Sequence, residues 1–466
     1  MQPRIDPEAL MINFEDRVGP DFGEHAPSYP DWEFPAWLAE AKFGIFVHWG
    51  LYSVPAWAEV DGAATPVEDA YRDHQYAEWY GNTVRIEGSG AQAHQRATYG
   101  PGTSYEDLAE LWHAEKFDAA ACLELFKSAG ARYVVPTAKH HDGFCLWDTE
   151  TTPFNSAARG PGRDLVGEFA AAARASGLKF GAYFSGALDW HVSGFRAISS
   201  DPDIFRLRRN DEDFARYSHA QVRELINRYR PDILWNDIEW PDAGKSDADF
   251  GVAALFAEYR RVVPGGIVND RWGVPSHGYL TREYSDIGTL TGKHWESCRG
   301  LGRSFGVNQR ETEADVLSVA DLVLHLVSVV SRNGNFLLNI GLAADGTVPD
   351  IYRDRLLGLG GWLARNGDAI YATTPWPGTL TRSQKDHYAV TVRPGATYLC
   401  VLTPDAELPP PPLDVALGRW LGADACASDR NRDGAQFAVP AELRGAPVAV
   451  FAIPGPHQPT QGETTA

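Results

Sequence analysis

The sequence predicts an α/β protein in which a (β/α)8-like, TIM-type barrel is followed by a small C-terminal all-β sandwich. Strands, polar loops and helices alternate through most of the chain, which is typical of a parallel sheet. Near the C-terminus the helices stop and short strands follow one another, which is typical of a sandwich. Polar side chains also stand where the strands end, and barrels have their chemistry at that edge. The 466 residues are enough for a barrel and a second module.

The first predicted strand covers residues 41–50, and Gly44 within it indicates close packing of the backbone. Residues 51–116 form a long insertion, whose aromatic content predicts an ordered functional loop. Helices and strands then alternate, and Asp118 and Gly177 mark helix ends. The helices are predicted over residues 117–130, 163–176, 213–228, 250–263, 316–330 and 351–366, and the strands over residues 131–137, 178–184, 233–235, 267–272 and 336–341.

The part of the chain beyond residue 372 is predicted to consist of strands alone. These strands cover residues 387–392, 397–402, 436–439 and 447–453. The chain is therefore divided into an N-terminal arm, a catalytic barrel, a β-sandwich and a disordered tail. The expected boundaries of these parts are residues 1–32, 33–372, 373–454 and 455–466.

The composition limits the partners of the protein. A net charge of −20 argues against nucleic acids and anionic membranes, so we expect a neutral substrate. No apolar run is long enough to cross a membrane and no secretory signal is visible, so a cytoplasmic location is expected. No GxGxxG or GxxxxGK[ST] motif indicates a nucleotide cofactor. The five cysteines form no CxxC pair, which argues against a disulfide framework and a structural zinc site; they are Cys122, Cys145, Cys298, Cys400 and Cys426.

The stretch over residues 231–241 holds the first candidate catalytic residue. Its three apolar residues, 233–235, predict a buried strand that ends at Asn236 and Asp237. A carboxylate at the end of a buried strand costs free energy unless it is paired or used. Asp237 is therefore either a catalytic carboxylate at the barrel rim or a cap of the following loop. The other predicted strand ends have further polar side chains, namely His48, His140, His141, Tyr183 and Arg271.

Three glutamates could act together with Asp237. They are Glu78, Glu283 and Glu296, each beside an aromatic residue. A pair of carboxylates in an aromatic-walled pocket for a neutral ligand is what glycoside hydrolysis requires. The spacing of these residues in the sequence does not give the distance between the carboxylates, so retention and inversion both stay open. Glu283 is expected in a loop after the strand over 267–272, whereas Glu296 could pair with Arg299 or Arg303 as a structural carboxylate.

Two other functions compete with this interpretation. His48, His140 and His141 could be the ligands of a metal-dependent hydrolase. Against a metal site, adjacent His140 and His141 would point to opposite sides of a regular strand, and no HxH or HExxH accompanies them. The second alternative is a catalytically inactive sugar-binding protein, which the presence of Asp237 with three candidate glutamates makes less favoured.

Several segments of the chain resemble the α-L-fucosidases of glycoside hydrolase family 29. The matching segments keep one order from about residue 35 to residue 372. The C-terminal module agrees with the family in position and type, but it contains no motif. The matching motifs are residues 42–50, 77–80, 139–144, 163–167, 234–237, 269–273, 295–296 and 334–339.

This resemblance implies a retaining mechanism without a metal or another cofactor, in which Asp237 is the nucleophile. The closest matching pattern places the acid/base in the Glu-Tyr pair that begins at Glu283. Phe305 would face the C6 methyl group of fucose, because recognition of a 6-deoxy sugar requires an apolar wall. The partner would be a glycan with a terminal α-L-fucoside, and a homo-oligomer stays open. The residues expected to bind the sugar are His48, Glu78, Trp79, His140, His141, Tyr183, Trp235, Arg271 and Phe305.

Two positions depart from the family pattern. Val307 stands where a Tyr often follows Phe-Gly, and Glu239 stands where a small residue is common. Both departures concern the side of the pocket that receives the leaving group. The acid/base residue also varies in position between subgroups of the family, so Glu78 and Glu296 remain alternatives to Glu283.

Overall fold

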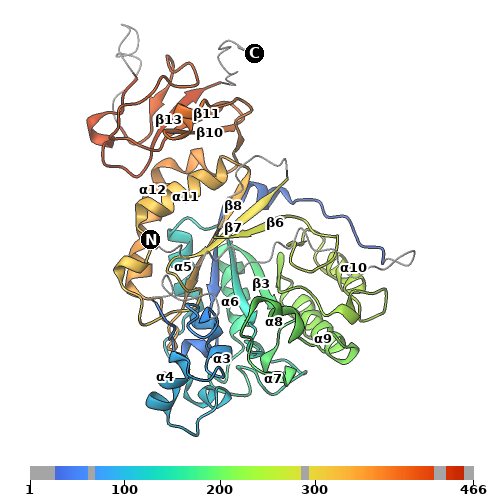
Figure 1. Cartoon of the computed structure of the whole chain (residues 1–466). Helices are drawn as coiled ribbons and strands as arrows, with labels where there is room; N and C mark the ends of the chain where they lie inside the picture. The colour runs from blue at the N-terminus through green and yellow to red at the C-terminus, as the bar shows by residue number, and fades with distance from the viewer. Residues whose placement is uncertain (1–26, 61–68, 285–292, 424–436, 456–466) are drawn as a thin grey trace.

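An eight-stranded parallel sheet forms the centre of the computed structural model, which describes residues 27–60, 69–284, 293–423 and 437–455 (Figure 1). Its strands are β1 (Phe43–His48), β2 (Tyr133–Lys139), β3 (Lys179–Ser185), β4 (Ile233–Asp237), β5 (Ile267–Val268), β6 (Leu280–Glu283), β7 (Trp295–Gly300) and β8 (Gly334–Gly341). Their order in the sheet is β5-β4-β3-β2-β1-β8-β7-β6. Consecutive strands other than β5 and β6 are therefore paired neighbours, and β1 pairs with β8, which is the circular order of the predicted (β/α)8-like barrel.

The sheet has a seam between β5 and β6, where side chains replace the strand ladder. The backbone N–H of Gly278 donates to the carbonyl of Val268 at 2.9 Å. The Oδ1 atom of Asp270 accepts from both the backbone N–H and the hydroxyl of Thr281, at 3.0 and 2.7 Å. These bonds join the segment after β5 to β6 and hold the two ends of the sheet together.

Successive residues of a strand enter two different cores, because side chains alternate between the faces of a sheet. In β1, Ile45 and Val47 pack in the large core under the helices, whereas Phe46 faces a smaller core inside the barrel. Tyr183 and Trp235 lie in that inner core with Phe46. The strands are thus buried on both faces, which explains their continuous apolar runs.

The helices predicted for the barrel are all present with small changes at their ends. Several begin at side-chain caps: Asp118, Asp164 and Ser318 each accept a backbone N–H of the first turn. Gly177 ends its helix in the left-handed conformation, with φ of 78°. These helices are α5 (Ala119–Ser128), α6 (Leu165–Ser176), α9 (Glu212–Tyr229), α10 (Val252–Val262), α11 (Val319–Val330) and α12 (Asp350–Asn366).

Short helices occupy the connections, including the described part of the insertion over residues 51–116. The α-helices among them are α2 (Ala36–Ala41), α3 (Tyr80–Thr83), α4 (Gly90–Tyr99), α7 (Trp190–Ser193), α8 (Asp201–Arg206) and α13 (Arg382–Lys385). The 3-10 helices are η3 (Leu51–Ser53), η6 (Ala77–Trp79), η7 (Glu106–Leu111), η8 (Asp242–Gly244), η9 (Glu313–Asp315), η10 (Gly367–Ala369) and η11 (Ala441–Leu443). Within the described ranges, no helix is both long and apolar enough to cross a membrane.

Strands β6 and β7 were not expected from the sequence. The expectation that Glu283 lies in a loop is wrong, because Glu283 is the last residue of β6. Polar and charged residues make up most of β6 and half of β7, so neither has the apolar run that identifies the other strands. By contrast, β5 is shorter than predicted, because it ends at Val268, four residues before the predicted end of that strand.

The C-terminal all-β module is confirmed as a five-stranded antiparallel sheet in the order β12-β13-β11-β10-β9. Tyr398 and Val450 on one face belong to the core of the barrel, whereas Leu399 and Phe451 belong to a separate cluster on the other face. The predicted strand over 436–439 is absent from the described residues 437–439. The strands are β9 (Thr374–Pro375), β10 (Tyr388–Arg393), β11 (Ala396–Val401), β12 (Arg419–Trp420) and β13 (Ala449–Pro454).

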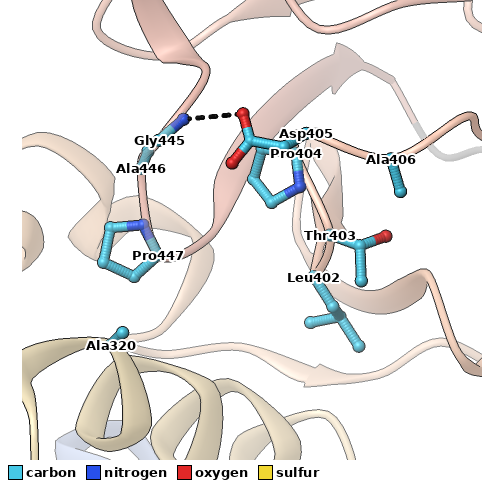
Figure 2. Close-up of a pocket in the computed structure, with 9 residues that line it drawn as sticks. All are labelled: Ala320, Leu402, Thr403, Pro404, Asp405, Ala406, Gly445, Ala446 and Pro447. Atoms are coloured by element: carbon cyan, nitrogen blue, oxygen red, sulfur yellow. Dashed lines mark hydrogen bonds between the residues drawn. The ribbon is translucent and has the colours of Figure 1, made fainter.

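A groove lies where loops of the C-terminal sheet approach α11 at Ala320 (Figure 2). Asp405 is the only ionisable residue of its lining, and its Oδ1 atom accepts the backbone N–H of Gly445 at 3.0 Å. Its remaining lining consists of small, apolar or hydroxyl side chains, so we place no functional site here. Most of the predicted N-terminal arm and of the predicted tail, and Cys426, lie outside the described residues.

Candidate active site

A pocket lies where the barrel strands end. His48, Asp237 and Glu283 are the last residues of β1, β4 and β6, and His140 follows directly after β2. Every catalytic and sugar-binding residue predicted from the sequence lines this pocket, so segments from residue 46 to residue 305 meet in one place. The lining consists of Phe46, His48, Tyr76, Glu78, Trp79, His140, His141, Tyr183, Trp235, Asp237, Arg271, Glu283, Cys298 and Phe305.

The carboxylate of Asp237 is surrounded by hydrogen-bond donors. The hydroxyl of Tyr183 donates to Oδ2 at 2.8 Å, and Nη1 of Arg271 donates to Oδ1 at 3.0 Å. Burial by itself would raise the pKa of Asp237, but the charge of Arg271 and the two hydrogen bonds outweigh it and lower the pKa below its usual value. Asp237 also accepts the N–H of Ile238, as the capping alternative expects, yet its other partners leave it a buried anion facing the pocket.

Glu283 lies across Arg271 from Asp237. Nη1 of Arg271 donates to Oε2 of Glu283 at 3.1 Å, so one nitrogen bridges the two carboxylates. Burial raises the pKa of Glu283 to about 7 against the lowering effect of Arg271, and the charge of Asp237 raises it further. Two carboxylates with pKa values displaced in opposite directions are suited to be one base and one acid.

Arg271 is itself held in place from two sides. Its Nε donates to the hydroxyl of Thr281 on β6 at 2.9 Å. Its guanidinium lies 4.8 Å from the ring centre of Trp235, over the face of the indole. The barrel seam described above thus fixes the cation that joins the two candidate catalytic groups.

The three candidate glutamates cannot be ranked by pKa alone, because burial raises the pKa of Glu78, Glu283 and Glu296 to about 7 each. Geometry separates them. Oε2 of Glu78 accepts from the hydroxyl of Ser304 at 3.0 Å and from the N–H of Gly306 at 2.8 Å, so Glu78 holds the loop that bears Phe305. Only Glu283 shares a hydrogen-bond donor with Asp237.

Glu296 lies beneath the pocket and does not line it. Its oxygens accept from the hydroxyl of Tyr133 at 2.6 Å and from the indole N–H of Trp235 at 3.0 Å. Glu296 is thus a structural carboxylate inside the barrel. The expected pairing with Arg299 or Arg303 is wrong, because a β7 residue facing the inner core meets the aromatic side chains of β2 and β4 instead.

The histidines present unprotonated nitrogens to the pocket. Nδ1 of His48 lies 2.6 Å from Oδ1 of Asn339, whose amide nitrogen donates elsewhere, so the imidazole is the donor. Nδ1 of His141 lies 2.7 Å from the hydroxyl of Ser185, which donates to a backbone carbonyl, so His141 is again the donor. Burial lowers the pKa of His48 to about 3 and that of His141 to about 4. Both Nε2 atoms can therefore accept a hydroxyl proton.

The argument that His140 and His141 point to opposite sides is wrong. Both line the pocket, with ring centres 4.1 Å apart, because β2 ends at Lys139 and neither residue belongs to the strand. In the described part of the chain, no three His, Cys, Asp or Glu residues are arranged to hold a metal ion. The buried Nδ1 of His140 has no hydrogen-bond partner among the described residues.

Aromatic rings form the apolar wall of the pocket. Phe305 contacts His48 and Tyr76, with ring centres 4.9 and 5.7 Å apart, and Trp79 lies 5.5 Å from His141. Three lining residues were missed from the sequence, namely Phe46, Tyr76 and Cys298. Tyr76 directly precedes the Ala77–Trp79 motif, and the period of β1 places Phe46 on the face of His48. Cys298 lies on β7, a strand with no sequence signal, and so could not be found.

Comparison with known proteins identifies the family of the chain. The family model described as "Alpha-L-fucosidase" matches residues 19–368. Tissue alpha-L-fucosidase of Bos taurus is 35% identical over 396 residues, which cover 81% of this chain and 78% of the relative. The crystal structure of Thermotoga maritima alpha-fucosidase with a mechanism-based inhibitor is 44% identical, covers 84% of this chain and 87% of that one, and has a TM-score of 0.75.

A further solved structure is an alpha-L-fucosynthase of Thermotoga maritima, in which an Asp is replaced by Gly and alpha-L-Fuc-(1-2)-beta-L-Fuc-N3 is bound. It is 40% identical, covers 97% of this chain and 99% of that chain, and has a TM-score of 0.79. The family model spans most of the barrel, and the match to the fucosynthase structure extends over the C-terminal sheet as well. The chain belongs to the α-L-fucosidase family of glycoside hydrolases.

Proposed function

We propose that this protein removes terminal α-L-fucose from fucosylated oligosaccharides or glycoconjugates, with Asp237 as nucleophile and Glu283 as acid/base. The observation that supports these roles is the bridge formed by Nη1 of Arg271, which is 3.0 Å from Asp237 and 3.1 Å from Glu283. Two such contacts keep the bonded oxygens within about 6 Å of each other, close to the ~5–5.5 Å of retaining enzymes and below the ~6.5–9.5 Å of inverting ones.

The reaction then proceeds in two displacements. The ionised carboxylate of Asp237 attacks the anomeric carbon, while Glu283 gives its proton to the departing glycosidic oxygen. In the second step Glu283, now ionised, takes a proton from water, and the water oxygen displaces Asp237 from the anomeric carbon. Glu283 ends protonated and Asp237 ends ionised, so both groups regain their starting states.

The remaining lining residues are proposed to bind the sugar. The Nε2 atoms of His48 and His141 accept sugar hydroxyl protons, because both imidazoles are neutral and donate through Nδ1. Phe305 lies in the aromatic wall and supplies the apolar contact that a C6 methyl group requires. Trp79, His140, Tyr183 and Glu78 complete the polar and aromatic surface. A homo-oligomer and a cytoplasmic location stay predictions from the sequence.

Hydrolysis of 4-nitrophenyl α-L-fucoside, followed by proton NMR, tests this function. We expect α-L-fucose to form first, with the β anomer rising later by mutarotation, because two displacements retain the configuration. Activity should be the same with and without EDTA. Formation of the β anomer first, loss of activity in EDTA, or faster cleavage of the corresponding galactoside would contradict the proposal.

A further inference from the structure

The backbone immediately after Asp237 has an unfavourable conformation. Ile238 and Glu239 have φ of 53° and 60°, so two successive residues with side chains lie in the left-handed region. That region is strained for residues other than Gly, and especially for a β-branched residue such as Ile. The turn places the N–H of Ile238 3.0 Å from Oδ1 of Asp237, so the orientation of this carboxylate depends on the turn.

Buried charges hold this turn from outside the pocket. Oε2 of Glu239 accepts from Nζ of Lys245 at 2.8 Å and from Nη2 of Arg208 at 3.0 Å. The side chains of Glu239, Arg208 and Lys245 are only 5%, 5% and 2% exposed. We call these three residues the ion triad. Asp242 adds a second carboxylate, 2.9 Å from Lys245 and 3.7 Å from Arg208, but its side chain is 46% exposed.

The backbone of the turn is also tied to the site. The side-chain amide of Asn236 donates to the carbonyl of Glu239 at 2.9 Å and to that of Arg271 at 2.8 Å. The turn is also packed tightly, because a Cβ added to Gly186 would lie 2.0 Å from the carbonyl oxygen of Glu239. A shift of the backbone at Glu239 therefore affects Asn236, which precedes Asp237 and is hydrogen-bonded to the carbonyl of Arg271.

The structure does not place Glu239 at the side of the pocket that receives the leaving group, so that expectation from the sequence is wrong. None of the members of the ion triad lines the pocket, and Nε and Nη1 of Arg208 are buried without a hydrogen-bond partner among the described residues. Such buried charges are costly compared with apolar residues. Stability alone does not explain these charges, because an apolar cluster could fill the same space. Their location behind a strained turn suggests that they fix the direction of the Asp237 carboxylate.

We infer that the ion triad positions the nucleophile: Glu239, fixed by Arg208 and Lys245, holds the left-handed turn that aims Asp237 between Tyr183 and Arg271. These are positioning residues, because they act through the turn and not on the sugar. The inference rests on the proposed role of Asp237. It assigns a purpose to Glu239, which stands where the family commonly has a small residue.

The variant Glu239→Gln tests the inference, because it keeps the shape of the side chain and removes its charge. We expect kcat to fall by about 10- to 100-fold, the size of effect that a small misplacement of a reacting group produces. The inhibition constant of free fucose should stay within about twofold, because no sugar contact changes. The rate at which 2-deoxy-2-fluoro-α-L-fucosyl fluoride labels Asp237, measured by mass spectrometry of the peptide, should fall in parallel with kcat.

A matched control is Asp232→Asn at the other end of the same strand. Asp232 precedes β4 and pairs with Lys179 at 2.7 Å, so this variant also exchanges a paired carboxylate for an amide. We expect it to be labelled at the wild-type rate. If Glu239→Gln is insoluble, we use the double variant Glu239→Gln/Lys245→Met, because it removes a cation together with the anion. We expect the same fall in the labelling rate.

The possible outcomes separate the two proposals. Labelling of the wild type at a residue other than Asp237 would refute the proposed function itself. Labelling of Asp237 in the wild type and at an equal rate in the Glu239 variant would refute only the positioning role. An equal loss of fucose binding and of labelling in the Glu239 variant would also refute it, because that pattern shows general disruption of the pocket.

Discussion

Two carboxylates in the same pocket, Asp237 and Glu283, have pKa values displaced in opposite directions although both are buried and both bind Arg271. Burial raises the pKa of each, so the difference comes from their other neighbours. Asp237 also accepts the Tyr183 hydroxyl, whereas the charge of Asp237 itself opposes ionisation of Glu283. This difference supports the proposed roles of Asp237 as nucleophile and Glu283 as acid.

The variant Asp237→Gly removes the attacking group and leaves the rest of the pocket. We expect kcat on an aryl fucoside to fall on the order of 10³-fold or more, since the covalent step is lost. Azide should restore turnover by entering the vacant side and should give the β-fucosyl azide, whose configuration is inverted. The wild type with azide is the control. Near-normal activity of the variant would reduce Asp237 to a cap of the loop.

The variant Glu283→Ala tests the acid. A proton donor matters most for a poor leaving group, so activity on a natural fucosyl oligosaccharide should fall far more than on a nitrophenyl fucoside. Glu283 must be protonated to donate, and with a pKa of about 7 its protonated fraction falls as the pH rises through that value. The wild type should therefore lose kcat/KM on the basic side, and the variant should lack this limb. Equal losses on both substrates with the limb retained would move the role to Glu78, the other candidate glutamate that lines the pocket.

At the scale of the elements, the sequence identified the strands that are apolar and missed those that are not. β4 is recognised because residues 233–235 are an apolar run, and Asp237 stands out at its end. β6, with Thr281, Arg282 and Glu283 among its four residues, has no such run and is a strand only because it pairs with β7. Glu283 could therefore be named as a candidate from the sequence, but its place at the end of a barrel strand could not.

Closure of the barrel between β5 and β6 depends on the hydroxyl of Thr281, which donates to Asp270 and accepts from Arg271. Thr281→Val removes both bonds with little change of shape. We expect the free energy of unfolding to fall by about 1–3 kcal/mol, because buried polar partners are left unpaired. Urea unfolding measures the change, and kcat/KM should fall as well, since Arg271 loses a support.

The chain offers a matched control for this substitution. Thr397 on β11 is buried and its hydroxyl has no hydrogen-bond partner among the described residues. Thr397→Val therefore removes no bond, and we expect its stability to equal or exceed that of the wild type. If both variants were equally stable, the side-chain bonds at the seam would contribute nothing to closure.

At the scale of the whole molecule, the barrel and the C-terminal sheet share a core. Tyr398 and Val450 of the sheet belong to the same buried cluster as Trp362 of α12, and the indole N–H of Trp362 donates to the carbonyl of Val448 at 2.9 Å. The sequence predicted the strands but not what they pack against, because a strand buried on both faces has an apolar run whichever partners cover it. The shared core implies that the two parts unfold together.

Calorimetry of Val390→Ala examines this cooperativity. Val390 lies in the cluster on the face of the sheet that is turned away from the barrel, so the substitution weakens the sheet alone, by roughly 1–3 kcal/mol. If the molecule is one cooperative unit, the variant shows a single transition at a lower temperature than the wild type. Fucose is proposed to bind only in the barrel pocket, so it stabilises the part of the molecule that unfolds together with that pocket. It should therefore raise the temperature of this single transition. Val450→Ala, on the face toward the barrel, should also show a single transition. A separate transition of Val390→Ala at a lower temperature, which fucose does not shift, would show that the sheet unfolds by itself.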